Sequence, residues 1–511
     1  MTAPVVERGG TGIVTVEWSA DTLTPVSAAL RLRDRLAFIL ESVEGGARYG
    51  RYSFVGVRGR TVVVDGNHAV VWDPDYVELE RFETNDPLEA LRRVLPAVRG
   101  AGGESADGGR GSTGHPPSNG AAFPFPLSAG VGYLAYEAAA RWERLPVPAA
   151  DPVGLPEALF HVPAVVIAFD HLAQTATLGT VDDDGANMRL ETVAARLARP
   201  VDDERPSRIR SHPRPPAPTR DPRYEAGVAH LVAEIHAGEM LQAVLARRFT
   251  MPCPAPALEV YRALRRINPS PHLFAIDLGP GRSILGASPE LLVGVRNGQV
   301  VTRPIAGTRP RSDDLVRDAQ LEADLLADEK ERAEHAMLVD LARNDVGRVA
   351  AIGSVEWPLL YAVERYSHVM HLVSEVRGRL RDGLDAFDAV RATFPAGTLS
   401  GAQKVRAMQS IAELEGERRG PYGGAVGFFS PTDVEAAITI RSVVLRDGVA
   451  YVHAGAGIVA DSVPERESAE VAAKAGAVLA ALAEAGDLAE AGAGDAAWAG
   501  NTAGATEGAP A

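Results

Sequence analysis

The clearest hydrophobic pattern in the chain predicts a helix over residues 328–344 that has glutamate side chains on its apolar face. Glu334 shares one side of that helix with three apolar residues at offsets of three, four and seven, namely Met337, Leu338 and Leu341. Glu331 lies one turn earlier on the same side. A carboxylate on a buried helix face is costly unless a cation or a hydrogen bond compensates its charge.

A second acidic helix is predicted downstream, beginning near Pro464. Glu467 and Glu470 align there on one face with Val471, Lys474 and Val478. Two helices that each direct carboxylates inward suit a hard cation, and Mg²⁺ is the first choice for carboxylate and water oxygens. The spacing alone leaves a second interpretation open, in which the glutamates lie at the rim of the fold and pair with arginines.

Shorter patterns organise the rest of the chain. Strands are predicted at residues 37–43, 52–56, 130–136 and 164–169, and helices at 24–32 and 86–98. The Gly/Ser/Pro-rich insert 100–122 and the Ala/Gly-rich tail 486–511 are predicted to be disordered, and the proline-rich segment 199–222 to be a linker. This division leaves an N-terminal region, 1–198, and a motif-rich domain, 223–485. Because helices and strands mix without regular βαβ alternation, the fold class is predicted to be α+β.

Composition narrows the class of protein. The chain has 511 residues, enough for two domains, and its formal net charge of −15 is dispersed, which argues against nucleic-acid binding. The single cysteine, Cys253, cannot form a disulfide within the chain, so nothing points to an oxidising compartment. The first residues lack a basic segment followed by an apolar one, and no apolar run reaches membrane-spanning length. We therefore expect a cytoplasmic protein.

Glycine-rich segments in the second domain could offer backbone amides to a ligand; they are 397–401, 422–427 and 455–457. Arg441, predicted on a strand between the last two, and the lysines Lys404 and Lys474 add positive charge. Such a set of donors suits a substrate that carries carboxylates. No G-x-G-x-x-G between a strand and a helix and no Walker A lysine is present, so nucleotide binding is not expected.

A series of ordered motifs occupies the second domain, at residues 238–242, 287–290, 304–308, 331–335, 341–345, 397–401, 422–427 and 455–457. This series resembles the chorismate-utilising enzymes, and among them most of all anthranilate synthase component I, from about Asp21 to Ala485. The resemblance implies a two-layer fold in which large antiparallel sheets are flanked by helices. It also implies Mg²⁺-dependent attack of ammonia on chorismate, loss of the ring hydroxyl and then loss of pyruvate to give anthranilate.

Carried over residue by residue, the resemblance assigns the binding groups. Glu334 and Glu470 match the Mg²⁺ ligands, with Glu331 and Glu467 in support, and the metal would clamp a carboxylate of the substrate. The residues that match chorismate contacts are Gly307, Thr308, Tyr422, Arg441, Gly455, Ala456, Gly457 and Lys474.

The resemblance also assigns the reacting groups. Glu290 matches the general acid that protonates the departing hydroxyl, a role that needs a raised pKa. His371 matches the histidine required to eliminate pyruvate. Relatives that add water to chorismate have a lysine base where this chain has Gln242, whose neutral amide can position ammonia but cannot deprotonate water. Relatives that aminate the other ring position have a lysine where this chain has Ala306, so both residues favour anthranilate formation.

Segments 39–46, 51–56 and 268–274 resemble the two sides of the family's tryptophan feedback pocket. The positions that match its binding residues are Ser42, Pro271, His272 and Leu273. His272 and Leu273 replace a more usual Tyr-Met pair, which leaves the affinity for tryptophan undetermined.

The source of nitrogen is expected outside the chain. Cys253 is flanked by prolines and lacks the tight glycine-flanked turn of a glutaminase nucleophile, so a separate glutamine amidotransferase subunit is the expected partner. Two alternatives are a 2-amino-2-deoxyisochorismate synthase of secondary metabolism, which stops before pyruvate loss, and a non-catalytic tryptophan-sensing scaffold. His371 argues against the first, and the joint presence of Glu290, Glu334 and Glu470 argues against the second.

Overall fold

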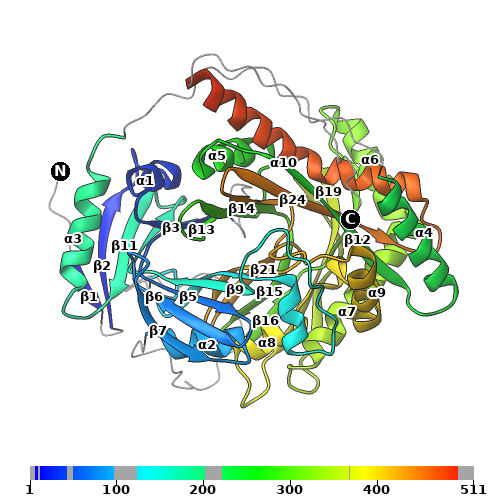
Figure 1. Ribbon diagram of the computed structural model, residues 1–511, viewed down its shortest axis with the longest axis horizontal. Helices are drawn as coiled ribbons and strands as arrows, with labels where there is room; N and C mark the ends of the chain where they lie inside the picture. Colours follow the sequence, from blue (N-terminus) through cyan, green and yellow to red (C-terminus); the bar gives the residue numbers. More distant parts are fainter. Residues whose placement is uncertain are drawn as a thin grey trace, which may run out of the picture.

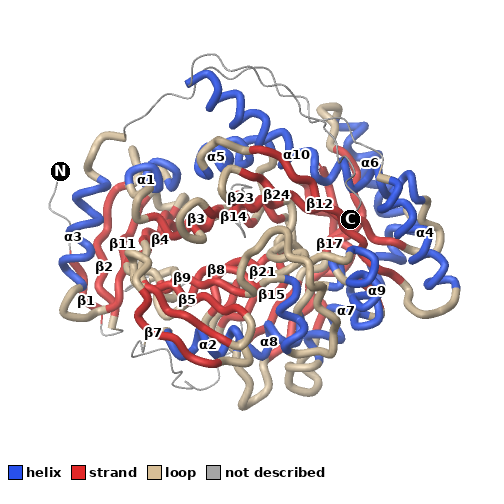
Figure 2. Tube along the Cα trace, viewed as in Figure 1, coloured by secondary structure: helices blue, strands red, loops and turns tan. Residues whose placement is uncertain are grey.

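Two large antiparallel sheets face each other across the centre of the molecule, and helices cover their outer faces (Figure 1). The computed structural model describes residues 6–9, 12–42, 50–96, 123–201, 221–366 and 369–492. Strands occupy the middle of the molecule and helices its periphery (Figure 2). The predicted α+β class, with large antiparallel sheets flanked by helices, is confirmed.

The first sheet has twelve strands. In spatial order they are β1 (Val6–Gly9), β2 (Ile13–Ser19), β11 (Thr175–Val181), β10 (Val165–Asp170), β4 (Tyr52–Val57), β3 (Leu36–Glu41), β13 (His272–Asp277), β14 (Arg282–Ser288), β23 (Ser442–Arg446), β24 (Val449–Ile458), β12 (Gln242–Pro252) and β20 (Gly401–Ala402). The N-terminal strands join the C-terminal ones where β3 pairs with β13, with Leu40 opposite Phe274.

The second sheet also contains strands from both parts of the chain. In order they are β17 (Ile305–Pro310), β19 (Val369–Arg379), β16 (Gln299–Thr302), β15 (Leu291–Arg296), β22 (Val434–Ile438), β21 (Ala425–Phe429), β8 (Gly130–Leu134), β9 (Ala158–Val162), β5 (Arg60–Asp65), β6 (His68–Trp72) and β7 (Glu78–Glu83), while β18 (Glu356–Arg365) pairs with β19. Here the two parts of the chain meet where β8 pairs with β21. Each sheet is therefore assembled from strands that lie on both sides of segment 199–222.

The α-helices are α1 (Pro25–Arg31), α2 (Pro87–Val94), α3 (Ala186–Leu197), α4 (Pro222–His236), α5 (Ala257–Ile267), α6 (Leu315–Ala327), α7 (Glu329–Gly347), α8 (Ala386–Thr393), α9 (Lys404–Glu415) and α10 (Pro464–Gly492), and the 3₁₀ helices are η1 (Tyr136–Arg141) and η2 (Gly397–Leu399). Helix α7 begins after Asp328, whose carboxylate accepts hydrogen bonds from the backbone N–H groups of Lys330 and Glu331. Helices α4, α5 and α10 pack together over the first sheet, and α2 and α8 lie against the second.

Three large buried clusters hold these layers together, and a small fourth one joins α6 to β19. One lies between the first sheet and its helices and includes Val471 and Val478 of α10, as their predicted helical face requires. A second lies between the second sheet and α2, α7 and α8. The third lies between the two sheets and is rich in aromatic side chains such as Phe38, Phe125 and Phe274.

Most predicted elements are present with small shifts at their ends. The helix expected at 328–344 is α7, and the strands expected at 37–43, 52–56, 130–136 and 164–169 are β3, β4, β8 and β10. Helix α10 continues to Gly492, past the residue at which the tail was expected to begin. The expected insert, 100–122, and most of the expected linker, 202–220, lie outside the described residues, as does the tail after residue 492.

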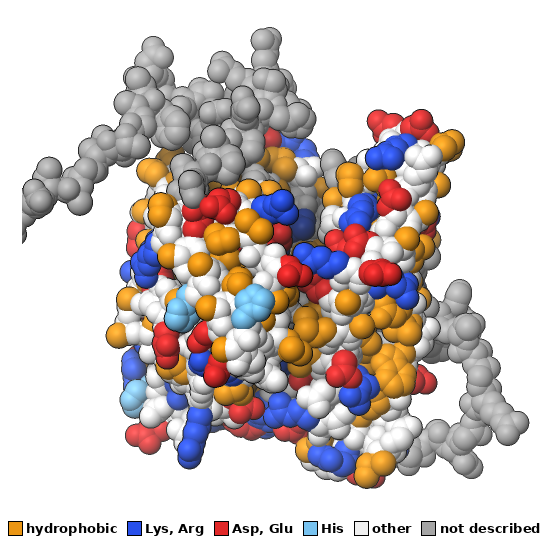
Figure 3. All heavy atoms as spheres, turned by 90° about the vertical axis from the view of Figure 1, so that its right-hand side faces the viewer, with side chains coloured by type: hydrophobic (Ala, Val, Ile, Leu, Met, Phe, Trp, Pro, Cys, Tyr) orange, Lys and Arg blue, Asp and Glu red, His pale blue; other side chains and the backbone are white. Residues whose placement is uncertain are grey.

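No helix in the described ranges is long and apolar enough to cross a membrane. On the face shown in Figure 3, acidic, basic and hydrophobic side chains are interspersed, which agrees with the dispersed charge of the sequence.

Candidate active site

Glu290 lies in the connection between β14 and β15 and is buried. Its Oε1 accepts a 3.1 Å hydrogen bond from the hydroxyl of Thr398 in η2. Burial raises the pKa of Glu290 to about 8, although the Thr398 hydroxyl, the backbone N–H of Ile305 and the charge of Lys474 oppose the rise. The carboxyl group is therefore protonated at neutral pH and can donate a proton, as a general acid must.

His371 of β19 lies opposite Thr308 of β17. Its Nδ1 is 2.9 Å from the carbonyl oxygen of Gly307 and 3.0 Å from the hydroxyl of Thr308. A carbonyl oxygen only accepts hydrogen bonds, so Nδ1 carries the proton and Nε2 is the basic nitrogen of the neutral ring. Burial lowers the pKa of His371, which keeps the ring neutral and ready to accept a proton.

The acidic residues of α7 and α10 act on one another. Burial raises the pKa of Glu334, and the negative charges of Glu331 and Glu470 raise it further. Burial also raises the pKa of Glu467, with Glu470 again adding to the effect. Lys474 opposes the rise in both cases and lies 2.8 Å from Oε1 of Glu470. The two helices thus bring their carboxylates close enough for mutual repulsion, but Glu470 and Lys474 are about half exposed, so the expectation that these two side chains point inward is wrong.

These carboxylates fit a divalent cation in charge and in donor type. Glu334 forms no hydrogen bond or ion pair with any described residue, so its charge has no direct partner. Glu331 instead lies 3.4 Å from Nη1 of Arg309, so for this residue the arginine-paired alternative is realised. Within the described ranges, no three His, Cys, Asp or Glu side chains are already gathered into a metal-ligand cluster.

Gln242, at the start of β12, is buried next to β24. Its Oε1 is buried and accepts no hydrogen bond from the part of the chain that the structure describes, which leaves one acceptor unused there. A Cβ atom at Gly457 would lie 2.5 Å from Nε2 of Gln242, and one at Gly455 would lie 3.1 Å from the hydroxyl of Tyr422. Both glycines therefore leave room for a predicted site residue, and Ala456 between them is buried.

Arg441 was predicted on a strand, and that prediction is wrong. It lies in the bend between β22 and β23 with a φ of 48°. Its Nη1 is 3.5 Å from Oδ1 of Asn268, it forms no ion pair with any described residue, and burial lowers its pKa. A guanidinium without a carboxylate partner favours an anionic ligand. Lys404, in contrast, is occupied, because its Nζ lies 3.0 Å from Asp345.

The residues predicted for the effector pocket also come together. Ser42, Pro271, His272 and Leu273 line a cavity of about 70 Å³, together with Tyr52, Phe54, Phe428 and Glu435. The hydroxyl of Ser42 is buried and has no hydrogen-bond partner among the described residues. Desolvation lowers the pKa of His272 to about 4, so its ring is neutral. An unpaired hydroxyl and a neutral imidazole beside aromatic walls suit a polar aromatic ligand.

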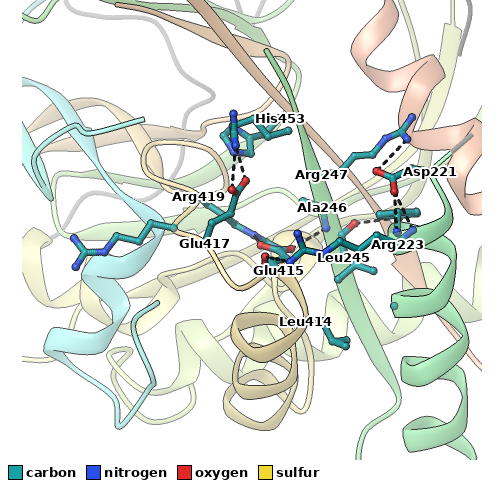
Figure 4. Close-up of a pocket in the computed structure, with 14 residues that line it drawn as sticks. Asp221, Arg223, Leu245, Ala246, Arg247, Leu414, Glu415, Glu417, Arg419 and His453 are labelled. Atoms are coloured by element: carbon teal, nitrogen blue, oxygen red, sulfur yellow. Dashed lines mark hydrogen bonds and ion pairs between the residues drawn. The ribbon is translucent and has the colours of Figure 1, made fainter. Parts of the chain in front are cut away.

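Sequence reasoning missed two residues that support the site. Thr398 holds Glu290, yet it was noted only as part of the glycine-rich segment 397–401. Arg419 lines a larger cavity of about 210 Å³ (Figure 4). The only sequence signal for Arg419 is its position shortly before Tyr422, within Arg418-Arg419-Gly420-Pro421-Tyr422.

Comparison with known proteins identifies the family of the chain. The chorismate binding enzyme family matches residues 81–480. The chain belongs to this family. Anthranilate synthase component 1 of Streptomyces coelicolor is 42% identical over 488 residues, covering 92% of this chain and 88% of the relative. The same-named protein of Pseudomonas aeruginosa is 41% identical over 488 residues, covering 91% of this chain and 94% of the relative. The predicted resemblance to anthranilate synthase component I is confirmed.

Solved structures of the family share the fold. Anthranilate synthase component I from Streptococcus pneumoniae superposes with a TM-score of 0.70 at 34% identity, covering 90% of this chain and 98% of that chain. MenF, the menaquinone-specific isochorismate synthase from Escherichia coli, has a TM-score of 0.66 at 20% identity and shares the fold alone, over 94% of this chain and 96% of that chain.

Proposed function

We propose that this family member is the chorismate-binding component of an anthranilate synthase, which converts chorismate and ammonia into anthranilate, pyruvate and water. The observation that carries the proposal is the pair formed by a protonated Glu290 and a neutral Gln242 with an unused acceptor. Together they supply an acid for a leaving hydroxyl and a hydrogen-bond acceptor for ammonia, without a base that could activate water.

In the amination step, Oε1 of Gln242 accepts an N–H of ammonia and orients its lone pair toward the ring. Glu290 gives its proton to the departing ring hydroxyl, which leaves as water. Arg441 and Lys474 bring positive charge to the carboxylates of chorismate, and Gly307, Thr308, Tyr422 and the segment 455–457 complete its contacts.

In the elimination step, Nε2 of His371 accepts the proton from the ring carbon that bears the new amino group. The bond from the ring to the enolpyruvyl oxygen then breaks, the ring becomes aromatic, and the released enolate takes up a proton to become pyruvate. The carbonyl of Gly307 and the hydroxyl of Thr308 keep the imidazole in the required tautomer throughout.

Glu334 and Glu470 would hold Mg²⁺, with Glu331 and Glu467 beside them. When bound, the ion supplies positive charge that binds a carboxylate of the substrate. Without the ion, Lys474 is the cation that faces Glu470 and lowers the pKa of Glu334.

Two further assignments belong to the same proposal. A cytoplasmic glutamine amidotransferase subunit supplies ammonia, because the chain's one cysteine, Cys253, is buried between prolines and desolvation raises its pKa. Tryptophan binds the cavity formed by Ser42 and residues 271–273 and inhibits the enzyme. The name "component 1" of the relatives supports a second component.

The decisive experiment incubates the purified chain with chorismate, MgCl₂ and ammonium and identifies the product by mass spectrometry. Anthranilate together with one equivalent of pyruvate supports the proposal. An aminated product that retains the enolpyruvyl group would instead favour the 2-amino-2-deoxyisochorismate synthase alternative. Glutamine should replace ammonium only after an amidotransferase subunit is added, and anthranilate from glutamine and the pure chain would contradict the partner assignment.

A further inference from the structure

Arg419 lies in the loop that follows α9, and its side chain is only 2% exposed. Its guanidinium donates to groups of three different segments, of which Figure 4 draws Glu415 beside Arg419. Nη1 donates to the carbonyl oxygen of Leu399 at 2.8 Å, and Nη2 donates to that of Val244 at 2.7 Å. Nε and Nη2 also donate to the two carboxylate oxygens of Glu415, at 2.8 and 2.5 Å.

Neighbouring acids fix this guanidinium in place. Oε1 of Glu415 accepts a 2.8 Å hydrogen bond from the backbone N–H of Ala246, so the ion pair binds β12 at two points. The carboxylate of Glu137 accepts the backbone N–H groups of Arg419 and Gly420 at 2.7 and 3.1 Å. Because the side chain of Arg419 makes four hydrogen bonds within the protein, it has little capacity left for a substrate.

Two of the three segments that Arg419 holds carry a residue of the proposed reaction. Val244 is two residues after Gln242 on β12, so both side chains lie on the same face of the strand. Leu399 directly follows Thr398, whose hydroxyl holds Glu290. Arg419 therefore connects the group that orients ammonia with the group that protonates the leaving hydroxyl.

We propose that Arg419 is a positioning residue that fixes the distance between Gln242 and Glu290, acting through Val244 on one side and through Leu399 and Thr398 on the other. This inference rests on the proposed function of the site. An arginine is required because its planar fork serves separate acceptors in fixed directions, whereas the single ammonium of a lysine cannot reach all of them at once. A displacement of about 1 Å at a reacting group can lower a rate by about 10²-fold.

The test compares Arg419→Lys with Arg418→Lys, a matched control at the neighbouring position. Arg418 donates to the carbonyl oxygen of Pro148 at the outside of the same loop. We expect R419K to lower kcat for ammonium-dependent anthranilate formation by about 10²-fold with a much smaller change in KM for chorismate, since the substrate contacts remain. We expect R418K to retain the kcat of the parent.

A pH profile distinguishes positioning from a general loss of structure. The Thr398 hydroxyl lowers the pKa of Glu290, so loosening η2 should raise that pKa and move the alkaline decline of kcat to higher pH. Thr398→Val should produce the same shift, and the double variant should show no additional one, because both changes remove the same hydrogen bond. If R419K does not fold, Glu415→Gln is a second variant that weakens the hold on Arg419. Its amide oxygen still accepts the N–H of Ala246 but no longer carries the charge that pairs with the guanidinium.

The inference is overturned if R419K, folded by circular dichroism and melting temperature, keeps the kcat of the parent. It is also overturned if kcat falls while the alkaline decline stays in place, or if the effects of R419K and T398V on the pH profile add. If the parent forms no anthranilate at all, the proposed function fails. That result differs from the three above, in all of which the parent is active.

Discussion

The ammonium group of Lys474 lies 2.8 Å from Oε1 of Glu470 and donates a 3.1 Å hydrogen bond to the carbonyl oxygen of Gly455. One lysine thus connects the acidic face proposed for Mg²⁺ with a glycine-rich segment proposed for chorismate. Its charge also lowers the pKa values of Glu290 and Glu334, so it influences the acid catalyst and a proposed metal ligand together. Metal binding and substrate protonation are therefore expected to be coupled through this side chain.

The first prediction concerns the acidic face. Glu334→Gln and Glu470→Gln should each abolish Mg²⁺-dependent turnover. Each should also weaken Mg²⁺ binding by more than about 10–100-fold, which is the usual effect of changing a residue that only supports a metal ligand. Because E334Q also removes repulsion among the acids and breaks no ion pair between described residues, metal-free E334Q should melt at the same or a higher temperature, whereas E470Q also loses the ion pair with Lys474. Calorimetric titration with MgCl₂ and thermal melts in EDTA measure the two effects.

Glu329→Gln is the matched control for this prediction, since Glu329 is exposed in the first turn of the same helix, α7. It should bind Mg²⁺ as the parent does. Near-normal turnover of E334Q or E470Q at saturating Mg²⁺ would remove the metal assignment.

The second prediction concerns Glu290 and pH. Because its pKa is raised to about 8, the acid is protonated below that pH, and the glutamine-fed rate of the assembled enzyme should fall as pH rises through about 8. Glu290→Gln should lower kcat by about 10²–10⁴-fold, the usual contribution of a general acid. A glutamine-fed rate that stays flat up to pH 10 would exclude Glu290 as the acid whose protonation limits the reaction.

The same pKa shift makes a prediction about stability. The folded protein holds the proton of Glu290 more tightly than the unfolded chain does, so the stability that this proton contributes is complete below about pH 4.5 and is lost as pH rises through about 8. The melting temperature of E290Q minus that of the parent should therefore be larger at pH 9 than at pH 6. Melting curves at both pH values measure this difference.

Local patterns in the sequence were sufficient to predict the supporting elements. Helix α7 and the first half of α10 follow from the spacing of apolar residues, because a helix must bury one continuous face. Strands such as β3 and β10 follow from short apolar runs. The predicted carboxylate groups of α7 and α10 come close, but the side chain of Glu470 is half exposed rather than packed inward.

The partners of individual charged groups could not be predicted, because strand pairing sets them over long separations in sequence. Lys404 pairs with Asp345, and Glu331 contacts Arg309, although nothing local distinguishes these choices. Arg441 lies in a bend with positive φ, but the apolar residues on both sides of it favour a strand in the sequence pattern. Arg419 donates to Val244, far back along the chain, because the edge of β12 lies beside its loop in the folded state.

The third prediction concerns His371. Replacing it with Met removes the neutral nitrogen that accepts the ring proton but leaves Glu290 and Gln242 in place. Chorismate should still be aminated, while pyruvate release slows by about 10²-fold or more, so an aminated intermediate accumulates. Chromatography with mass detection follows the intermediate, and a lactate dehydrogenase assay follows pyruvate.

His230→Met provides the control for this experiment, because the side chain of His230 is exposed on α4, where it faces Glu234 rather than a residue of the proposed site. It should form anthranilate at the rate of the parent. Anthranilate formation by H371M at that same rate would transfer the elimination role to another residue.

The last prediction concerns feedback through the cavity between β3, β13 and β22. Ser42→Phe fills that cavity and should abolish inhibition by tryptophan without lowering uninhibited kcat, because the cavity shares no lining residue with the proposed reaction site. Glu435→Gln removes a carboxyl group that lines the cavity and forms no hydrogen bond or ion pair with the residues that the structure describes, and should weaken tryptophan binding through the ligand's ammonium group. If tryptophan acts by favouring a conformation with weaker chorismate affinity, it raises the Kd for chorismate by some factor. Chorismate must then raise the Kd for tryptophan by that same factor. Calorimetric titrations of tryptophan with and without chorismate measure this factor, and an unchanged inhibition curve for S42F, or a parent that tryptophan does not inhibit, would refute the pocket.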